Sequence, residues 1–152
     1  MSHWCQGVLE TVSVRGAGNY VVVFPAYRPD LVEDLALTLG CAFVDFRRER
    51  LAPLGPEAHR LSLEAINACA AERANDRGVV LQNAEALLAA KSSEDRRAWL
   101  ADFTHTPRSG IVILPLAIFG QDAPQDGRVI RLAQDGLPQE SLLRQLSSIR
   151  FQ

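Results

Sequence analysis

The chain has few of the residues that build disulfide frameworks or metal sites. Its 152 residues include three cysteines and three histidines. Cys5, Cys41 and Cys69 are widely spaced and form no CxxC pair, which argues against a disulfide framework and a zinc site. Cys41 and Cys69 are expected to be core thiols. No histidine stands four residues from another metal-ligand type. The residues therefore indicate no metal and no cofactor.

Long apolar runs and a strong net charge are also missing. No apolar run approaches the roughly 20 residues that span a bilayer, and the N-terminus lacks a basic region followed by an apolar stretch. We therefore expect a cytoplasmic protein without membrane contact. The formal net charge of -2 gives no general attraction to nucleic acid, so such a contact would need a local patch.

The length is near the modal size of one domain, and the apolar pattern predicts a single α/β domain over residues 1–152. A helix and linker occupy residues 1–18, and the core occupies residues 19–152. Strands alternate with helices, which is typical of a three-layer αβα arrangement with a mainly parallel five-stranded sheet. The predicted strands cover residues 20–24, 41–46, 78–82, 111–119 and 129–132, and the helices residues 1–14, 30–40, 62–75, 84–90, 94–104 and 139–149.

Three features within these elements make the prediction more specific. Asp30 is expected to cap its helix and Gly40 to end it. Pro115 is expected to end or bend its strand. Residues 47–59 and 120–127 are expected to be exposed loops, and residues 120–127 the most flexible segment.

Three segments resemble parts of one family. GVVLQNAEALL (residues 78–88) is similar to the Walker B strand of AAA-type and related P-loop ATPases, and IVILPLAIF (residues 111–119) to the strand that carries the first sensor. RVIRLAQDGLPQESLLRQL (residues 128–146) is similar to their last strand, its Pro-containing turn and the following helix. The resemblance covers most of residues 20–149 and implies a P-loop NTPase-like fold.

The residues that carry the chemistry of that family are missing. A phosphate-binding loop needs GxxxxGK[ST], so that backbone amides and a lysine surround phosphate and a hydroxyl holds magnesium. The corresponding residues 25–30, PAYRPD, contain no glycine, lysine or hydroxyl at that spacing. Gln82 or Asn83 stands where the resemblance implies a metal-orienting aspartate, and only Glu85 is near. We therefore expect a degenerate domain that does not hydrolyse ATP and is not an enzyme.

A small ligand is the alternative use of the carboxyl edge of the sheet, where open α/β sheets bind ligands. The candidate ligand-binding residues are Tyr27, Arg28, Asn83, Glu85 and His105, with Asp45 nearby. A purely structural interpretation competes with this one: Tyr27 covers the sheet edge, Arg28 pairs with Asp30 or Glu33, and His105 belongs to a polar connection.

Protein contact is the function that a degenerate member of this family implies. The expectation is a non-catalytic regulatory or scaffolding subunit whose partner is an ATPase subunit or a member of a DNA-linked assembly. Trp4, Arg47, Arg48 and Arg50 are the candidate partner-binding residues.

Three alternatives stay open: a ligand or nucleotide sensor or enzyme, a homo-oligomer, and a receiver-like (βα)5 signalling domain. The receiver-like alternative lacks the carboxylate cluster that its phosphoacceptor chemistry needs at the ends of the first and third strands.

Overall fold

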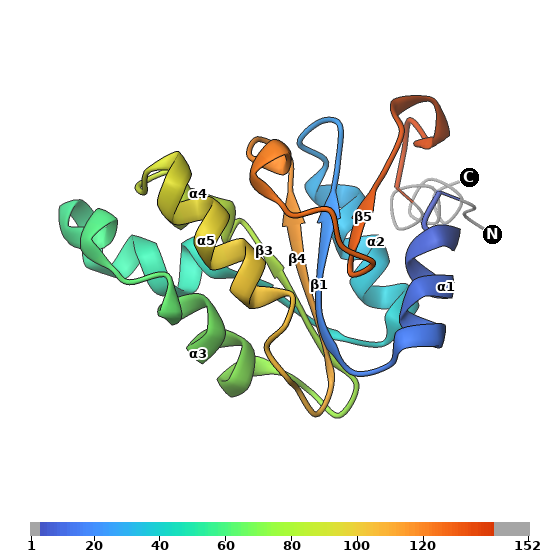
Figure 1. The fold of residues 1–152 in the computed structure, drawn as a ribbon, viewed down its shortest axis with the longest axis horizontal. Helices are drawn as coiled ribbons and strands as arrows, with labels where there is room; N and C mark the ends of the chain where they lie inside the picture. Colours follow the sequence, from blue (N-terminus) through green and yellow to red (C-terminus); the bar gives the residue numbers. More distant parts are fainter. Residues whose placement is uncertain (1–3, 142–152) are drawn as a thin grey trace, which may run out of the picture.

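A parallel sheet forms the centre of the molecule. The computed structural model describes residues 4–141, and within them five strands pair side by side, all parallel, in the order β2-β3-β4-β1-β5 (Figure 1). The predicted five-stranded parallel α/β sheet is thus confirmed. Its strands are β1 (Gly18–Val23), β2 (Ala42–Asp45), β3 (Gly78–Gln82), β4 (Ile111–Leu116) and β5 (Val129–Arg131).

The strand order separates β1 from β3. Strand β4 lies between them and pairs with both. In the flavodoxin-type order, 2-1-3-4-5, the first and third strands are neighbours and frame the site at their carboxyl ends. The observed order therefore argues against the receiver-like alternative.

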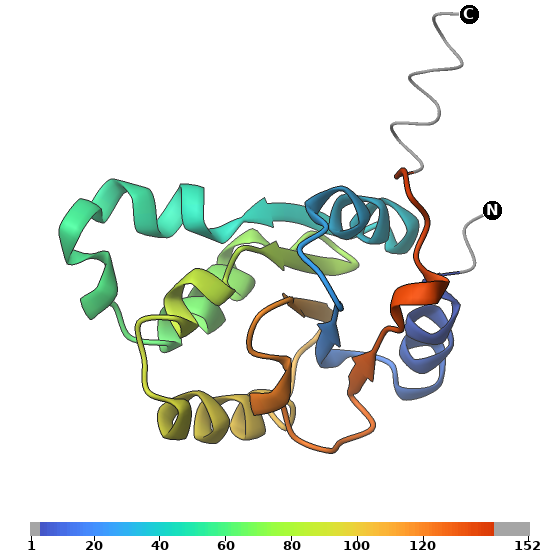
Figure 2. The same ribbon diagram turned by 90° about the horizontal axis from the view of Figure 1, so that it is seen from above.

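Helices cover both faces of the sheet (Figures 1 and 2). Helices α1 (Gln6–Arg15) and α2 (Pro29–Leu39) pack on one face, and α3 (Glu64–Arg73), α4 (Glu85–Leu88) and α5 (Ser93–Phe103) pack on the other. Side chains alternate along each strand, so Val21 joins one buried cluster while Tyr20 and Val22 join the other. Cys41 and Cys69 are buried and free, as predicted. Among the described helices, none has the length and apolarity to cross a membrane.

The ends of α2 follow from its sequence, although not entirely as predicted. Gly40 adopts the left-handed conformation and stops the helix, as expected. The N-cap is Arg28 rather than Asp30, because Pro29 fits the first helical position, where no amide donor is needed. Asp30 lies in the first turn instead.

Residues 47–59 are not a loop. They form a π-helical turn, Arg47–Leu51, and a 3-10 helix, Ala52–Arg60, with a kink at Gly55. Gly55 and Pro56 usually interrupt a helix, but here they only bend the helical segment between β2 and α3. The prediction of an exposed surface holds, since most side chains of residues 52–60 are exposed.

Strand β4 continues through Pro115 and ends at Leu116. The amide of Ile111 donates to Arg77 on the β3 side, so the missing amide of Pro115 also faces that side. Pairing with β3 extends only to Ile113, and no ladder bond is therefore lost. The predicted closing helix, residues 139–149, lies outside the described residues except for 139–141, which are not helical.

Candidate functional site

A small cleft opens at the carboxyl edge of the sheet, where β1, β3 and β4 end. Its cavity volume is about 20 Å³, far below the roughly 300–1,000 Å³ of typical ligand pockets. Four of the five predicted ligand-binding residues line it. The lining comprises Phe24, Ala26, Tyr27, Arg28, Val32, Gln82, Asn83, Glu85, Pro115, Leu116 and Ala117.

Arg28 is paired within its own loop. Its Nε and Nη2 atoms donate to the two carboxylate oxygens of Asp30 at 3.1 and 2.9 Å, and Nη2 also donates to the Gln139 carbonyl at 3.1 Å. The hydrogen bonds from Arg28 hold the pKa of Asp30 below its usual range, and those same bonds raise the pKa of Arg28. A phosphate would have to compete with a bidentate carboxylate for this guanidinium.

Asn83 joins the loop after β3 to the loop after β1. It adopts a left-handed conformation with φ of 66°, which asparagine tolerates better than most residues. Its Oδ1 accepts from the Tyr27 hydroxyl at 2.9 Å and from Gln82 Nε2 at 3.2 Å, and its Nδ2 donates to Asp45 at 3.1 Å. The polar atoms of this side chain therefore have partners inside the fold.

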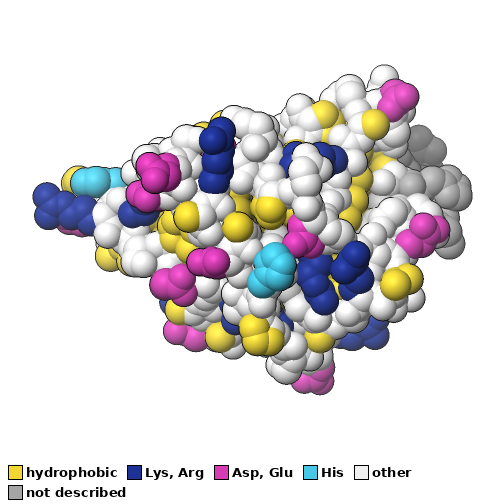
Figure 3. Space-filling view, viewed as in Figure 1, with side chains coloured by type: hydrophobic (Ala, Val, Ile, Leu, Met, Phe, Trp, Pro, Cys, Tyr) yellow, Lys and Arg dark blue, Asp and Glu magenta, His cyan; other side chains and the backbone are white. Residues whose placement is uncertain are grey.

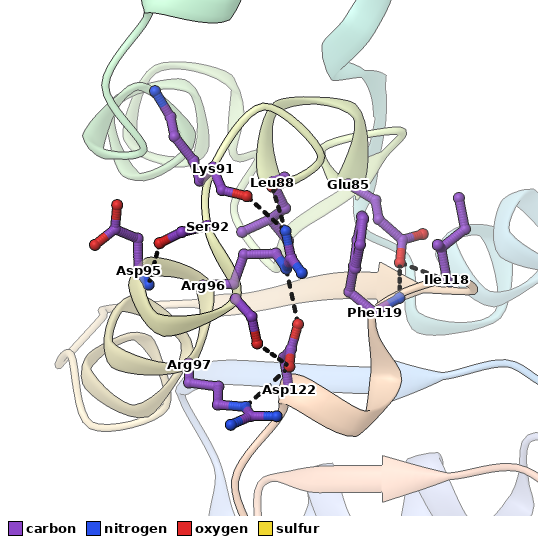
Figure 4. Close-up of polar contacts among 11 residues, drawn as sticks. Glu85, Leu88, Lys91, Ser92, Asp95, Arg96, Arg97, Ile118, Phe119 and Asp122 are labelled. Atoms are coloured by element: carbon purple, nitrogen blue, oxygen red, sulfur yellow. Dashed lines mark hydrogen bonds and ion pairs between the residues drawn. The ribbon is translucent and has the colours of Figure 1, made fainter.

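Glu85 holds the chain segment that follows β4. Its carboxylate oxygens accept from the backbone amides of Ala117 at 2.8 Å, Ile118 at 2.7 Å and Phe119 at 2.7 Å. Figure 4 shows the side chain reaching from the start of α4 toward these amides. The residue is 8% exposed. Its carboxylate thus works as a structural anchor of the cleft wall.

His105 does not lie at this cleft. It follows α5 and precedes β4, which places it at the amino edge of the sheet. There Nδ1 lies 2.9 Å from the Ala101 carbonyl, and Nε2 lies 3.5 Å from Asp126. The expectation that His105 converges with Tyr27 and Asn83 is wrong, because a helix-to-strand connection in a parallel sheet runs to the opposite edge.

The predicted partner-binding residues differ in exposure. Trp4 is 8% exposed and packs 5.8 Å from the Phe24 ring, so the expected surface position is wrong. Its apolar ring is buried between α1 and the sheet. Arg50 pairs with Glu72 at 2.5 Å. Arg47 and Arg48 are exposed and form no ion pair with the described residues.

Surface charge does not favour one sign on the face seen in Figure 3, where basic and acidic side chains are interspersed. Residues 4–141 also contain no group of three histidine, cysteine or acidic side chains arranged to hold a metal ion. The recognisable chemistry of the carboxyl edge is therefore a small, mostly apolar cleft with an internal polar network.

The sequence prediction missed an ion cluster around the buried Asp122 beside the cleft wall. Asp122, whose side chain is 1% exposed, accepts from Arg96 at 2.7 Å and from Arg97 at 3.0 Å. Arg96 also donates to the Lys91 carbonyl at 2.6 Å and stacks over Phe119 at 4.0 Å (Figure 4). Its hydrogen bond to Asp122 is the main cause that lowers the pKa of that carboxyl.

This cluster corrects one prediction. Residues 120–127 were expected to be an exposed loop but contain a buried, tethered turn, Gly120–Asp122. The sequence around Asp122, which lies among glycine and proline, does not indicate an ion pair, because its partners lie about 25 residues away on α5.

Comparison of the chain with protein-family models, curated proteins and solved structures finds no match. What is shown is therefore the architecture: a five-stranded parallel α/β sheet flanked by helices.

Proposed function

We propose that this chain is a non-catalytic regulatory or scaffolding subunit with a degenerate P-loop ATPase-like fold, which acts through protein-protein contacts. The position of β4 between β1 and β3 supports this proposal. Strand β4 resembles the first-sensor strand. It lies between β1, which precedes the loop at the phosphate-binding position, and β3, which resembles the Walker B strand.

The proposal rests mainly on the charged groups at the cleft, which already have partners within the fold. Of the residues that line it, Arg28 is paired with Asp30, and Glu85 is bound by three backbone amides. A phosphate-binding loop instead offers free amides and an unpaired cation. Pro25 and Pro29 remove two amide donors from this loop. Nucleotide would therefore replace existing contacts rather than complete a vacant site.

Two large apolar side chains beside the cleft support a contact function. Tyr27 is 59% exposed and lines the cleft, and Ile118 is 65% exposed and directly follows Ala117, which also lines it. Exposed aromatic and aliphatic side chains often anchor protein interfaces. We place the partner surface here, at the carboxyl edge.

Quantitative recovery of partners from the native host tests this function. We expect the tagged full chain to recover a protein in stoichiometric amount after mild crosslinking, and Ile118→Arg to reduce that recovery at least about tenfold. Leu54→Arg is the matched control, since Leu54 is 42% exposed on the distant 3-10 helix. Absence of any stoichiometric partner with the unmodified chain would refute the proposal.

A ligand sensor is the second candidate, favoured by the convergence of Tyr27, Arg28, Asn83 and Glu85 on one cleft. Isothermal titration with ATP and ADP, with and without magnesium, separates the two. The scaffold proposal expects no heat of binding up to millimolar nucleotide. Micromolar binding that Arg28→Ala abolishes would instead establish the sensor.

A further inference from the structure

A second, larger groove lies at the amino edge of the sheet, opposite the cleft described above. Its cavity volume is about 280 Å³, just below the roughly 300–1,000 Å³ of typical small-molecule sites. It runs between α3 and the segment that joins α5 to β4. Its lining comprises Ala70, Ala71, Ala74, Gly78, Pro107, Arg108, Ser109, Gly110, Ile111 and Val112.

Small residues keep this groove open. Gly78 has φ of 147°, and a Cβ there would lie 1.8 Å from the Ile111 carbonyl oxygen. Strands β3 and β4 therefore approach each other closely where they begin. Ala71 on the facing helix α3 and Ala74 just after its end are exposed and leave room above this backbone floor.

Arg108 is the one charged side chain in the lining, and neutral groups hold it. Its Nε donates to Asn19 Oδ1 at 3.1 Å, and its Nη2 donates to Asn67 Oδ1 at 2.5 Å. Both amides are fixed in turn, because Asn19 donates to the Phe103 carbonyl at 2.9 Å and Asn67 donates to Glu64 at 3.0 Å. The guanidinium is thus oriented by two amide oxygens that carry no charge.

No carboxylate neutralises Arg108 within residues 4–141, where it forms no ion pair. The nearest acidic influence is Glu64, whose carboxylate is engaged by Asn67 and by Trp99. Burial lowers the pKa of Arg108, although a guanidinium stays charged at neutral pH. A partly desolvated cation whose direct hydrogen-bond partners are neutral still attracts an anion.

Two residues of the lining, Ser109 and Gly110, directly follow Arg108 in the chain. The backbone N–H groups of Ser109 and Gly110 donate to no acceptor in the described part of the chain. Because Nε and Nη2 of Arg108 already donate to Asn19 and Asn67, Nη1 is the guanidinium nitrogen left to bind an oxyanion. Guanidinium and backbone N–H donors are groups that carboxylates and phosphates accept from.

We propose that the amino-edge groove binds a small organic oxyanion, a carboxylate or a phosphate with a short apolar portion. Arg108 binds the charged group, and the apolar portion lies along Ala71 and Ala74. This site is separate from the partner surface at Tyr27 and Ile118, because the two lie at opposite edges of the sheet.

Nuclear magnetic resonance of the full chain tests the site with two probes, sodium propionate and inorganic phosphate, titrated at constant ionic strength. We expect saturable shifts of the Arg108 side-chain Nε–Hε signal and of the amides of Ser109 and Gly110. The probe with the lower dissociation constant identifies the preferred anion. Shifts that grow linearly without saturation for both probes would overturn the proposal.

Three variants locate the binding. Arg108→Gln should weaken binding at least about tenfold, since a charge-assisted contact is lost. Ala71→Leu, at an exposed helical position, should fill the groove and weaken propionate binding without removing the cation. Arg48→Gln, which removes an exposed arginine elsewhere, should bind as the unmodified chain does. If Arg108→Gln and Ala71→Leu both bind like the unmodified chain, the site is refuted, and melting curves confirm that each variant is folded.

Discussion

Removing the Glu85 carboxylate should destabilise the protein and loosen the wall of the carboxyl-edge cleft. In Glu85→Ala, the amides of Ala117, Ile118 and Phe119 lose the acceptor that lies 2.7 to 2.8 Å from each of them. A hydrogen bond to a charged group contributes about 1.5–3 kcal/mol, and an unsatisfied buried donor costs about 1–3 kcal/mol. Ile118 is 65% exposed, so water can replace its partner more easily than that of the other two amides.

We therefore expect a loss of about 3 kcal/mol in the free energy of unfolding, which is less than three full bonds would suggest. For a chain of this size that corresponds to a fall in Tm of about 6–12 °C. Glu85→Gln should lose about 1–2 kcal/mol, because its amide keeps one acceptor oxygen but turns an NH₂ toward the remaining donor.

Urea unfolding measures the global loss, and hydrogen exchange of the three amides measures the local one. Glu57→Ala is the matched control, since Glu57 pairs with Arg60 at the surface and should cost less than about 0.5 kcal/mol. If Glu85→Ala loses under about 1 kcal/mol and the three amides exchange no faster, Glu85 does not anchor the segment. It would then be free to act as the ligand-binding residue that the sequence suggested.

Two other sites give distinct stability predictions. Asp122→Asn should cost about 2 kcal/mol at pH 7, because Arg96 and Arg97 lose their buried counter-charge. The lowered pKa of Asp122 means that its contribution to the free energy of unfolding is complete above about pH 5 and is lost as the pH falls below about 4. The free energies of unfolding of the unmodified chain and of Asp122→Asn, measured with urea, should therefore converge at low pH. A difference that does not shrink between pH 7 and pH 3.5 would contradict this. Gly78→Ala should destabilise by more than about 2 kcal/mol, because its Cβ would collide with the Ile111 carbonyl. Gly7→Ala, in the first turn of α1 where an added Cβ meets nothing, should stabilise by about 0.5–1 kcal/mol. Thermal melts that rank the two variants the other way would refute the packing argument.

The strands could be predicted because their signal is local. The run GVVLQ is apolar over its whole length, and β3 covers those same residues, Gly78–Gln82. A helix end with a glycine was also accessible, as Gly40 shows. Residues 47–59 were missed because proline and glycine are read as breaks, although a short 3-10 helix tolerates a kink at Gly55.

The contacts at the cleft could not be predicted in the same way. Glu85 meets amides more than 30 positions further along the chain, and the partners of Asp122 lie on α5. No local pattern reports such pairs. His105 was a different kind of error, because its place between a helix and the next strand already assigns it to the amino edge.

Arg28 and Arg108, at the two edges of the sheet, thus differ in the charge of their hydrogen-bond partners. At the carboxyl edge, Arg28 is satisfied by a carboxylate two residues away, which favours a surface that meets a partner through Tyr27 and Ile118. At the amino edge, Arg108 is oriented by Asn19 and Asn67 without being neutralised. A guanidinium that needed only a structural tie would be more stable beside a carboxylate, since charged acceptors form stronger bonds than amides do. Neutral acceptors fix its direction and leave its charge for a ligand.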